Sequence, residues 1–215
     1  MYVFPTSRYS IEIRGTASPN PHFPDRDVQL MSRTNTKDYL GLTHTMPKGL
    51  KSTSSIVSIS SSTVEAGPNT FTQSQVSLDL SPLDNEVFVV VAIDLNPSFP
   101  DGLAGVDTAT QACISTTSRA TMGFIEDDNV LASASGAIRA AGFVDGGVGF
   151  QQSALETPPA TLDYIGIIAT NDFFLSVQGT GNLGPKVVGA RVWGYRARAD
   201  ASIYAALVQS EVLSA

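Results

Sequence analysis

The stretch LDYIGIIATNDFFLSVQGTGN, residues 162–182, predicts two strands around a short polar turn. The second strand places Phe173, Leu175 and Val177 on one face, which is the period-two pattern of a strand with one buried face. The first strand, 162–169, is apolar on both faces. Because a sandwich buries only one face of each sheet, something must cover the other face of this strand.

Similar apolar segments recur along the chain, separated by Gly, Pro, Asn or Asp. They predict strands over 54–64, 70–80, 87–95, 109–118, 122–125, 137–143, 162–169, 173–179 and 186–197. The third of these, in EVFVVVAIDL, is again apolar on both faces. Two segments could be helical: 129–141, which is rich in alanine but contains Gly136, and 199–214, where Asp200 could cap the N-terminus.

Many short strands without alternating helices predict an all-β fold, an antiparallel β-sandwich. A jelly roll is favoured over an immunoglobulin-type sandwich, because the sequence has no Cys…Trp…Cys spacing and has longer loops at 96–108 and 145–161. Three prolines in TASPNPHFPDRD exclude a helix there. We therefore expect an extended N-terminal arm over 1–53, a sandwich domain over 54–215 and a short C-terminal helix.

The composition is poor in charge. Charged residues make up 15% of the chain, where about 25% is ordinary, while Ser and Thr together number 43. A hydroxyl-rich surface loses less on burial than an ionic one, so other subunits can cover it at low desolvation cost. The single cysteine excludes an internal disulfide framework. We expect a soluble protein made without export, since the N-terminus lacks a secretory pattern and no run of about 18 apolar residues occurs.

Charge is unevenly distributed along the chain. Residues 1–51 carry seven basic and four acidic residues, a net of +3, whereas 52–185 carry two basic and fourteen acidic ones. Arg8 and Arg14 in the arm could contact nucleic acid, but arms that do so usually concentrate basic residues. The sequence favours arginines that pair with neighbouring chains instead.

No motif predicts catalysis. His22 and His44 lie in the irregular arm, where nothing fixes a general base, and no Gly-x-Ser-x-Gly elbow occurs. Cys113 lies in a strand-like segment without a nearby histidine and is expected to be a buried, small apolar residue. GTGNLG, residues 179–184, has the spacing of a dinucleotide-binding loop, but a strand follows it rather than a helix. We expect a hairpin loop there, and no cofactor or small-molecule substrate.

Two groups of acidic residues could form a functional site, either a calcium site or a pair of catalytic carboxylates. IEDDN offers Glu126, Asp127 and Asp128 as calcium ligands, although the order differs from an EF-hand and such residues often precede a helix or solvate a loop. Three aspartates could act as a catalytic carboxylate pair of a glycosidase, but no aromatic residues cluster around them. These are Asp94, Asp101 and Asp107.

The segment VWGYRARAD concentrates Trp193, Tyr195, Arg196 and Arg198. Aromatic residues and arginine are favoured at recognition surfaces, so this segment could be an interface or sugar-stacking patch. It could equally be a last strand whose aromatic residues close the core. The sequence leaves both interpretations open.

The strands that are apolar on both faces need a cover from the arm, a long loop or a neighbouring copy. The low charge and the proline-stiffened arm fit the last of these. With many copies in contact, a homo-oligomer would complete the outer face of each sheet.

An arm of this kind, a jelly-roll-like body and a short closing helix resemble the small single jelly-roll capsid proteins of icosahedral viruses. The segments LDYIGIIATNDFFLSVQGTGN and VWGYRARADASIYAALVQSEVLSA are also similar in texture to coat-type proteins of environmental, especially marine, viruses. The chain departs from RNA-virus coats in lacking a strongly basic arm. The resemblance implies self-assembly into a virion shell after synthesis in the host cytoplasm, without catalysis. The alternative is a carbohydrate-binding or adhesin-type sandwich, such as a phage tail or fibre component.

Overall fold

The computed structural model describes residues 47–140, 147–152, 154–156 and 163–213. The chain divides into two units, Met1–Leu42 and Thr43–Ala215, and all described residues belong to the second. The expected arm before residue 47, with Arg8, Arg14 and both histidines, lies outside the described residues.

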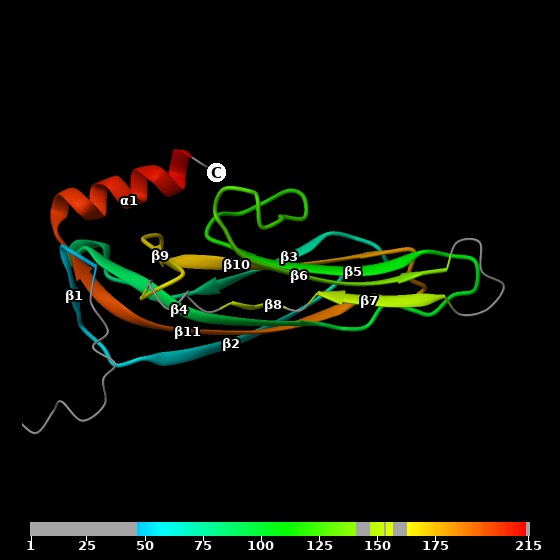
Figure 1. The fold of residues 1–215 in the computed structure, drawn as a ribbon. Helices are drawn as coiled ribbons and strands as arrows, with labels where there is room; N and C mark the ends of the chain where they lie inside the picture. Colours follow the sequence, from blue (N-terminus) through cyan, green and yellow to red (C-terminus); the bar gives the residue numbers. More distant parts are fainter. Residues whose placement is uncertain (1–46, 141–146, 153, 157–162, 214–215) are drawn as a thin grey trace, which may run out of the picture. The chain divides into compact units, whose positions relative to one another are not determined.

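Within these residues the chain forms two antiparallel sheets and one α-helix (Figure 1). The elements are β1 (Leu50–Ser52), β2 (Val57–Val64), β3 (Thr72–Ser77), the 3₁₀ turn η1 (Pro82–Asp84), β4 (Glu86–Pro97), β5 (Thr108–Ser115), β6 (Val130–Arg139), β7 (Val148–Gln152), β8 (Ala154–Glu156), β9 (Gly166–Ile168), β10 (Asp172–Thr180), β11 (Val187–Ala199) and α1 (Ala201–Leu213). No helix among the described residues has the length and apolar character needed to cross a membrane.

The strand order confirms the predicted sandwich. In the first sheet, β11 pairs with β1, β2 and β4, and β4 pairs in turn with β8 and β9. The second sheet has the order β3-β10-β5-β6-β7. Consecutive strands therefore pass repeatedly from one sheet to the other, and β2-β11-β4-β8 facing β3-β10-β5-β6 is the strand arrangement of a jelly roll.

The main core lies between the two sheets. As the alternation in β10 predicts, Phe173, Leu175 and Val177 are fully buried there. From the facing sheet, Ile93 of β4 and Val192 of β11 pack into the same core. Burying apolar side chains of this size stabilises the fold by about 1.5–3 kcal/mol each.

Strand β4 is buried on both faces, and its own chain supplies the cover. Phe88 and Val90 pack into the main core, while Val87 and Val89, which alternate with them, belong to a second buried cluster. That cluster also contains Tyr195 of β11 and is closed by side chains of α1. In Figure 1, α1 lies along the end of the unit where β1, β4 and β11 meet.

The helix therefore corrects the expectation that an arm, a loop or a neighbouring copy covers these strands. Ile203, Tyr204 and Leu207 of α1 pack on the second cluster. The predicted strand 162–169 meets the same two layers, since Ile168 lies in the main core and Ile167 contacts the helix-covered cluster. Its apolar pattern reflects a helix on one face and a sheet on the other.

A β-bulge lies between the two halves of β4. Trp193 of β11 pairs with Ala92, and the next residue, Gly194, pairs with Val90, so Val91 is the extra residue. Such a bulge shifts which side chains face the core. Phe88 and Val90 point into the main core before it, and Ile93 and Leu95 do so after it.

Some of the secondary-structure elements expected from the sequence differ from those in the structure. The possible helix 129–141 is not helical over its described part, 129–140. Instead, β6 is a strand in which Ala132 and Ala134 are buried between the partly exposed Ser133 and Ser135, and this period-two alternation outweighs alanine's helix preference. Residues 122–125 form no strand, because they belong to a loop held by the Arg119–Asp127 ion pair. The expected helix at 199–214 is confirmed as α1.

The loop GTGNLG is not a hairpin, because β10 and β11 lie in different sheets and the loop joins them. Of its three glycines, only Gly181 has a positive φ, of 69°. A side chain there would also meet the backbone oxygen of Asp107. Glycine at this position therefore permits both the left-handed backbone and the close approach.

Glu211 fixes the C-terminal half of α1 to the sheets. Its carboxylate is buried and accepts hydrogen bonds from the backbone N–H groups of Ala169, at 3.0 Å, and Thr170, at 2.9 Å. Burial raises the pKa of this carboxyl above its ordinary value. The cost of burying the group is offset by two backbone donors that would otherwise lack partners.

Replacing Glu211 by Ala should lower the free energy of unfolding by about 1–3 kcal/mol, because it leaves one buried and one partly buried N–H donor unsatisfied. Urea denaturation followed by circular dichroism measures this loss. Gln209→Ala, at an exposed position of the same helix, is the control and should leave the midpoint within experimental error. Equal midpoints for the two variants would contradict the role given to Glu211.

Gly194→Ala should also destabilise the protein, by about 1–3 kcal/mol, because the added methyl group overpacks the bulge. A Cβ at this position would lie 2.4 Å from both the Phe88 ring and the backbone oxygen of Val89. Gly189→Ala, in the same strand but with no heavy atom within 4 Å of the new Cβ, should be neutral. Thermal denaturation of both variants tests the difference, and similar melting temperatures would refute it.

Candidate functional site

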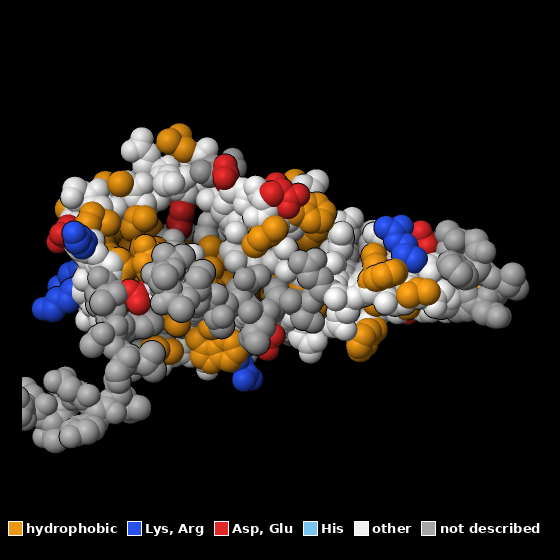
Figure 2. Space-filling view, viewed as in Figure 1, with side chains coloured by type: hydrophobic (Ala, Val, Ile, Leu, Met, Phe, Trp, Pro, Cys, Tyr) orange, Lys and Arg blue, Asp and Glu red, His pale blue; other side chains and the backbone are white. Residues whose placement is uncertain are grey.

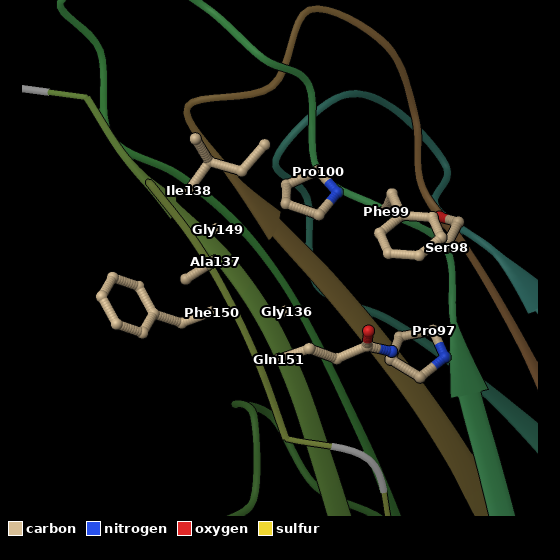
Figure 3. Close-up of a pocket in the computed structure, with 10 residues that line it drawn as sticks. All are labelled: Pro97, Ser98, Phe99, Pro100, Gly136, Ala137, Ile138, Gly149, Phe150 and Gln151. Atoms are coloured by element: carbon tan, nitrogen blue, oxygen red, sulfur yellow. The ribbon is translucent and has the colours of Figure 1, made fainter. Parts of the chain in front are cut away.

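The end of the sandwich that contains the β6–β7 strands holds an apolar slot of about 270 Å³ (Figure 3). One wall is the segment 97–100 that follows β4, and the other is formed by β6 and β7. In Figure 3 the side chain of Gln151 extends across the slot toward Pro97, while Phe150 points away from it. The lining residues are Pro97, Ser98, Phe99, Pro100, Gly136, Ala137, Ile138, Gly149, Phe150 and Gln151.

None of these lining residues carries a titratable side chain. The slot therefore offers no general acid or base side chain from its own walls. It can accommodate an apolar group, and two prolines stiffen one of its walls.

A partly buried ion pair lies next to the slot wall at Phe99. The ammonium of Lys186 is buried and donates to Asp101 Oδ1 at 2.6 Å and to the carbonyl of Phe99 at 3.2 Å. Asp101 also accepts from the backbone N–H of Leu183 at 2.8 Å. The hydrogen bond from Lys186 holds the pKa of Asp101 below its ordinary value. These contacts tie the loop after β4 to the loop between β10 and β11.

Glu65 completes this network, although no sequence motif marks this residue. Its buried carboxylate accepts from the backbone N–H groups of Gly179 and Lys186 at the two ends of the GTGNLG loop. Asn182 of the same loop is buried and accepts from the N–H of Asp101 at 2.9 Å. The loop is therefore held by groups from the segments that follow β2 and β4.

The three aspartates considered as a glycosidase pair have separate surroundings. Asp101 binds Lys186, and Asp107 pairs with Arg139 at 3.0 Å and accepts from the N–H of Ala140. Asp94 stands exposed on the first sheet. Cys113 is buried in β5, as predicted, and burial raises the pKa of its thiol.

The proposed calcium ligands follow a tight turn of the loop 116–129. Asp127 pairs with Arg119 at 2.8 Å and accepts from the N–H of Phe124, while Glu126 and Asp128 are exposed. Across the described residues, no three acidic, histidine or cysteine side chains gather in a way that could hold a metal ion. Asp127 orders the loop through its arginine partner.

The aromatic and arginine residues of VWGYRARAD separate into three environments. Tyr195 is buried beneath α1, so the core interpretation holds for it. Arg196 donates to the carbonyls of Leu78 and Asp79, and Arg198 pairs with Asp84. Trp193 remains partly exposed on the outer face of the first sheet.

In comparisons with known protein families and with curated proteins, no family model and no curated protein matches this chain. The resemblance to jelly-roll capsid proteins therefore stays a prediction.

Replacing Asp101 by Asn tests the ion pair through its pH dependence. A carboxyl whose pKa is lowered in the folded state stabilises the protein above its ordinary pKa of 3.8, and this contribution is lost as the pH falls further. Stability of the wild type should therefore fall more steeply below that pH than stability of Asp101→Asn. Urea midpoints recorded from about pH 6 down to about pH 2 measure the difference, and parallel curves would contradict it.

Proposed function

We propose that this protein is a structural subunit that self-assembles into a closed shell of the virus-capsid type. The observation that carries the proposal is a group of exposed apolar side chains at the slot end of the sandwich. Phe99 is 76% exposed, Leu183 74% and Phe150 60%. With Val148 they form what we call the end patch.

The end patch consists of neighbouring segments that are held firmly in place. Phe99 and Leu183 flank the Lys186–Asp101 ion pair, and Phe150 and Val148 lie on β7 beside the slot. Figure 2 shows hydrophobic side chains on the surface at this end. Large exposed apolar groups on rigid backbone are typical of surfaces that bind another protein.

A second apolar surface lies at the other end of the sandwich. Leu83 on η1 is 99% exposed beside the start of α1, where Arg198 pairs with Asp84. The only charged residue of α1 is the buried Glu211, so the outward face of this helix is neutral. Exposed apolar groups that gather on one part of a surface are typical of interaction sites.

Two different apolar surfaces on one subunit favour assemblies larger than a dimer. A two-fold dimer satisfies one surface, whereas contacts between unlike surfaces add further subunits, giving closed assemblies where the rotation closes and filaments where it does not. The low charge supports the same proposal, and on the face seen in Figure 2 charged side chains are sparse. Fold alone carries no function, so the proposal rests on these surfaces rather than on the jelly-roll order.

The purified full-length protein should form large particles at neutral pH, detected by light scattering and seen as closed shells by negative-stain electron microscopy. The double variant Phe99→Ser, Leu183→Ser should lose them, because it removes two large apolar anchors of the end patch without touching the buried core.

Phe124→Ser is the matched control, since Phe124 is exposed on the loop 116–129, outside the end patch. It should assemble like the wild type, and all variants should keep the circular dichroism spectrum of the wild type. A wild type that stays monomeric at high concentration, or an end-patch variant that assembles normally, would overturn the proposal.

A further inference from the structure

The outer face of the first sheet holds a second concavity, which is chemically unlike the apolar slot. It is a shallow groove of about 320 Å³ across β2, β11 and β4, beyond the part of the face that α1 covers. Its volume lies at the lower end of the range of about 300–1,000 Å³ that is typical of small-ligand sites. Its polar lining comes from Ser60, Asp94, Asn96 and Arg191.

Strand register places these groups in rows across the three strands. Arg191 of β11 lies opposite Ser60 of β2 on one side and Asp94 of β4 on the other. In the adjacent row, Gly189 lies between Ser62 and Asn96. Because alternate residues of a strand share a face, these side chains stand together on the exposed side of the sheet.

Gly189 creates the hollow. An added Cβ at this position would have no heavy atom within 4 Å, so the space above the strand is open. On the other side of Arg191, the next row contains Trp193, whose ring centroid lies 5.9 Å from the Arg191 guanidinium carbon. The groove therefore combines a vacant floor with a row of polar side chains. The partly exposed indole of Trp193 lies beside it, next to Arg191.

We propose that this groove binds a neutral carbohydrate, a role that goes beyond shell formation. A pyranose presents vicinal hydroxyls that both donate and accept hydrogen bonds, together with apolar C–H faces. Asp94 supplies acceptors, Arg191 supplies donors, and Asn96 supplies both. The indole of Trp193 gives an apolar surface beside them.

The groove chemistry disfavours other occupants. Nucleic acid binding depends on several cations that neutralise phosphates, whereas here a single arginine stands opposite an aspartate. A second copy of the chain would have to bury both charges, and interface cores are depleted in charged residues. A neutral polyhydroxylated ligand satisfies both charges through hydrogen bonds and, in a shallow groove, leaves them in contact with solvent.

The probes are the methyl glycosides of glucose, galactose, mannose and N-acetylglucosamine, added at millimolar concentration to the full-length protein. Saturation-transfer NMR should detect binding of at least one of them. Gly189→Val places a branched side chain in the hollow, where its Cβ has open space, and Asp94→Ala removes the acceptor. Each substitution should raise the dissociation constant of the glycoside by at least about tenfold.

Phe124→Ala, which changes an exposed aromatic residue on the loop 116–129, is the control and should bind like the wild type. Trp193→Ala, with an unchanged melting temperature, should also lose affinity. No signal from any of the glycosides, or wild-type affinity in both Gly189→Val and Asp94→Ala, would overturn the proposal. Particle formation is measured separately, so either proposal can fail without the other.

Discussion

The packing of α1 on the outer face of β4 and β11 is the contact on which the rest of the structure depends. Because of this contact, β4 lies between the helix and the opposite sheet. Val87 and Val89 face the helix, and Phe88 and Val90 face the opposite sheet. The two clusters share one backbone, so loss of the helix would expose an apolar sheet face. A helix with little amphipathic character is held there by tertiary packing and by Glu211 rather than by its own sequence pattern.

The sequence predicted the features that depend on local alternation. The alternation in β10 identified Phe173, Leu175 and Val177 as core residues, and the double-sided pattern of β4 identified a strand buried on both faces. It did not identify what covers that strand. The pattern of apolar residues in β4 is the same whichever segment packs on it, and the helix lies more than 100 residues away in the chain. The bulge at Val91 was equally hidden, since a shift between two apolar faces leaves the pattern apolar. The alternating alanine and serine residues of β6 were compatible with a helix or a strand. Pairing with β5 makes this segment a strand.

The same limit applies to the candidate sites. Trp193 and Tyr195 alternate with the same phase along β11, yet only Tyr195 lies under α1, because the helix covers one end of the sheet face. The apolar slot and the polar groove each combine residues from segments far apart in the chain. Their chemistry differs: one end of the sandwich presents bare apolar side chains, and one broad face presents hydroxyls, an amide and two opposite charges. The proposed contact with other subunits at the ends and the proposed recognition of a ligand on the face would therefore use separate surfaces.

The position of Cys113 gives the protein an intrinsic reporter of its own opening. It is the only sulfhydryl in the sequence, fully shielded in β5, where it pairs in register with Ser133 and Ser176. Its environment includes Gly123 and Arg119 of the loop above it. Alkylating reagents can therefore reach the thiol only when that loop lifts or the sheet separates. The rate of thiol modification then measures how often the protein opens locally in this way. Oxidative crosslinking between intact molecules is barred by the same shielding.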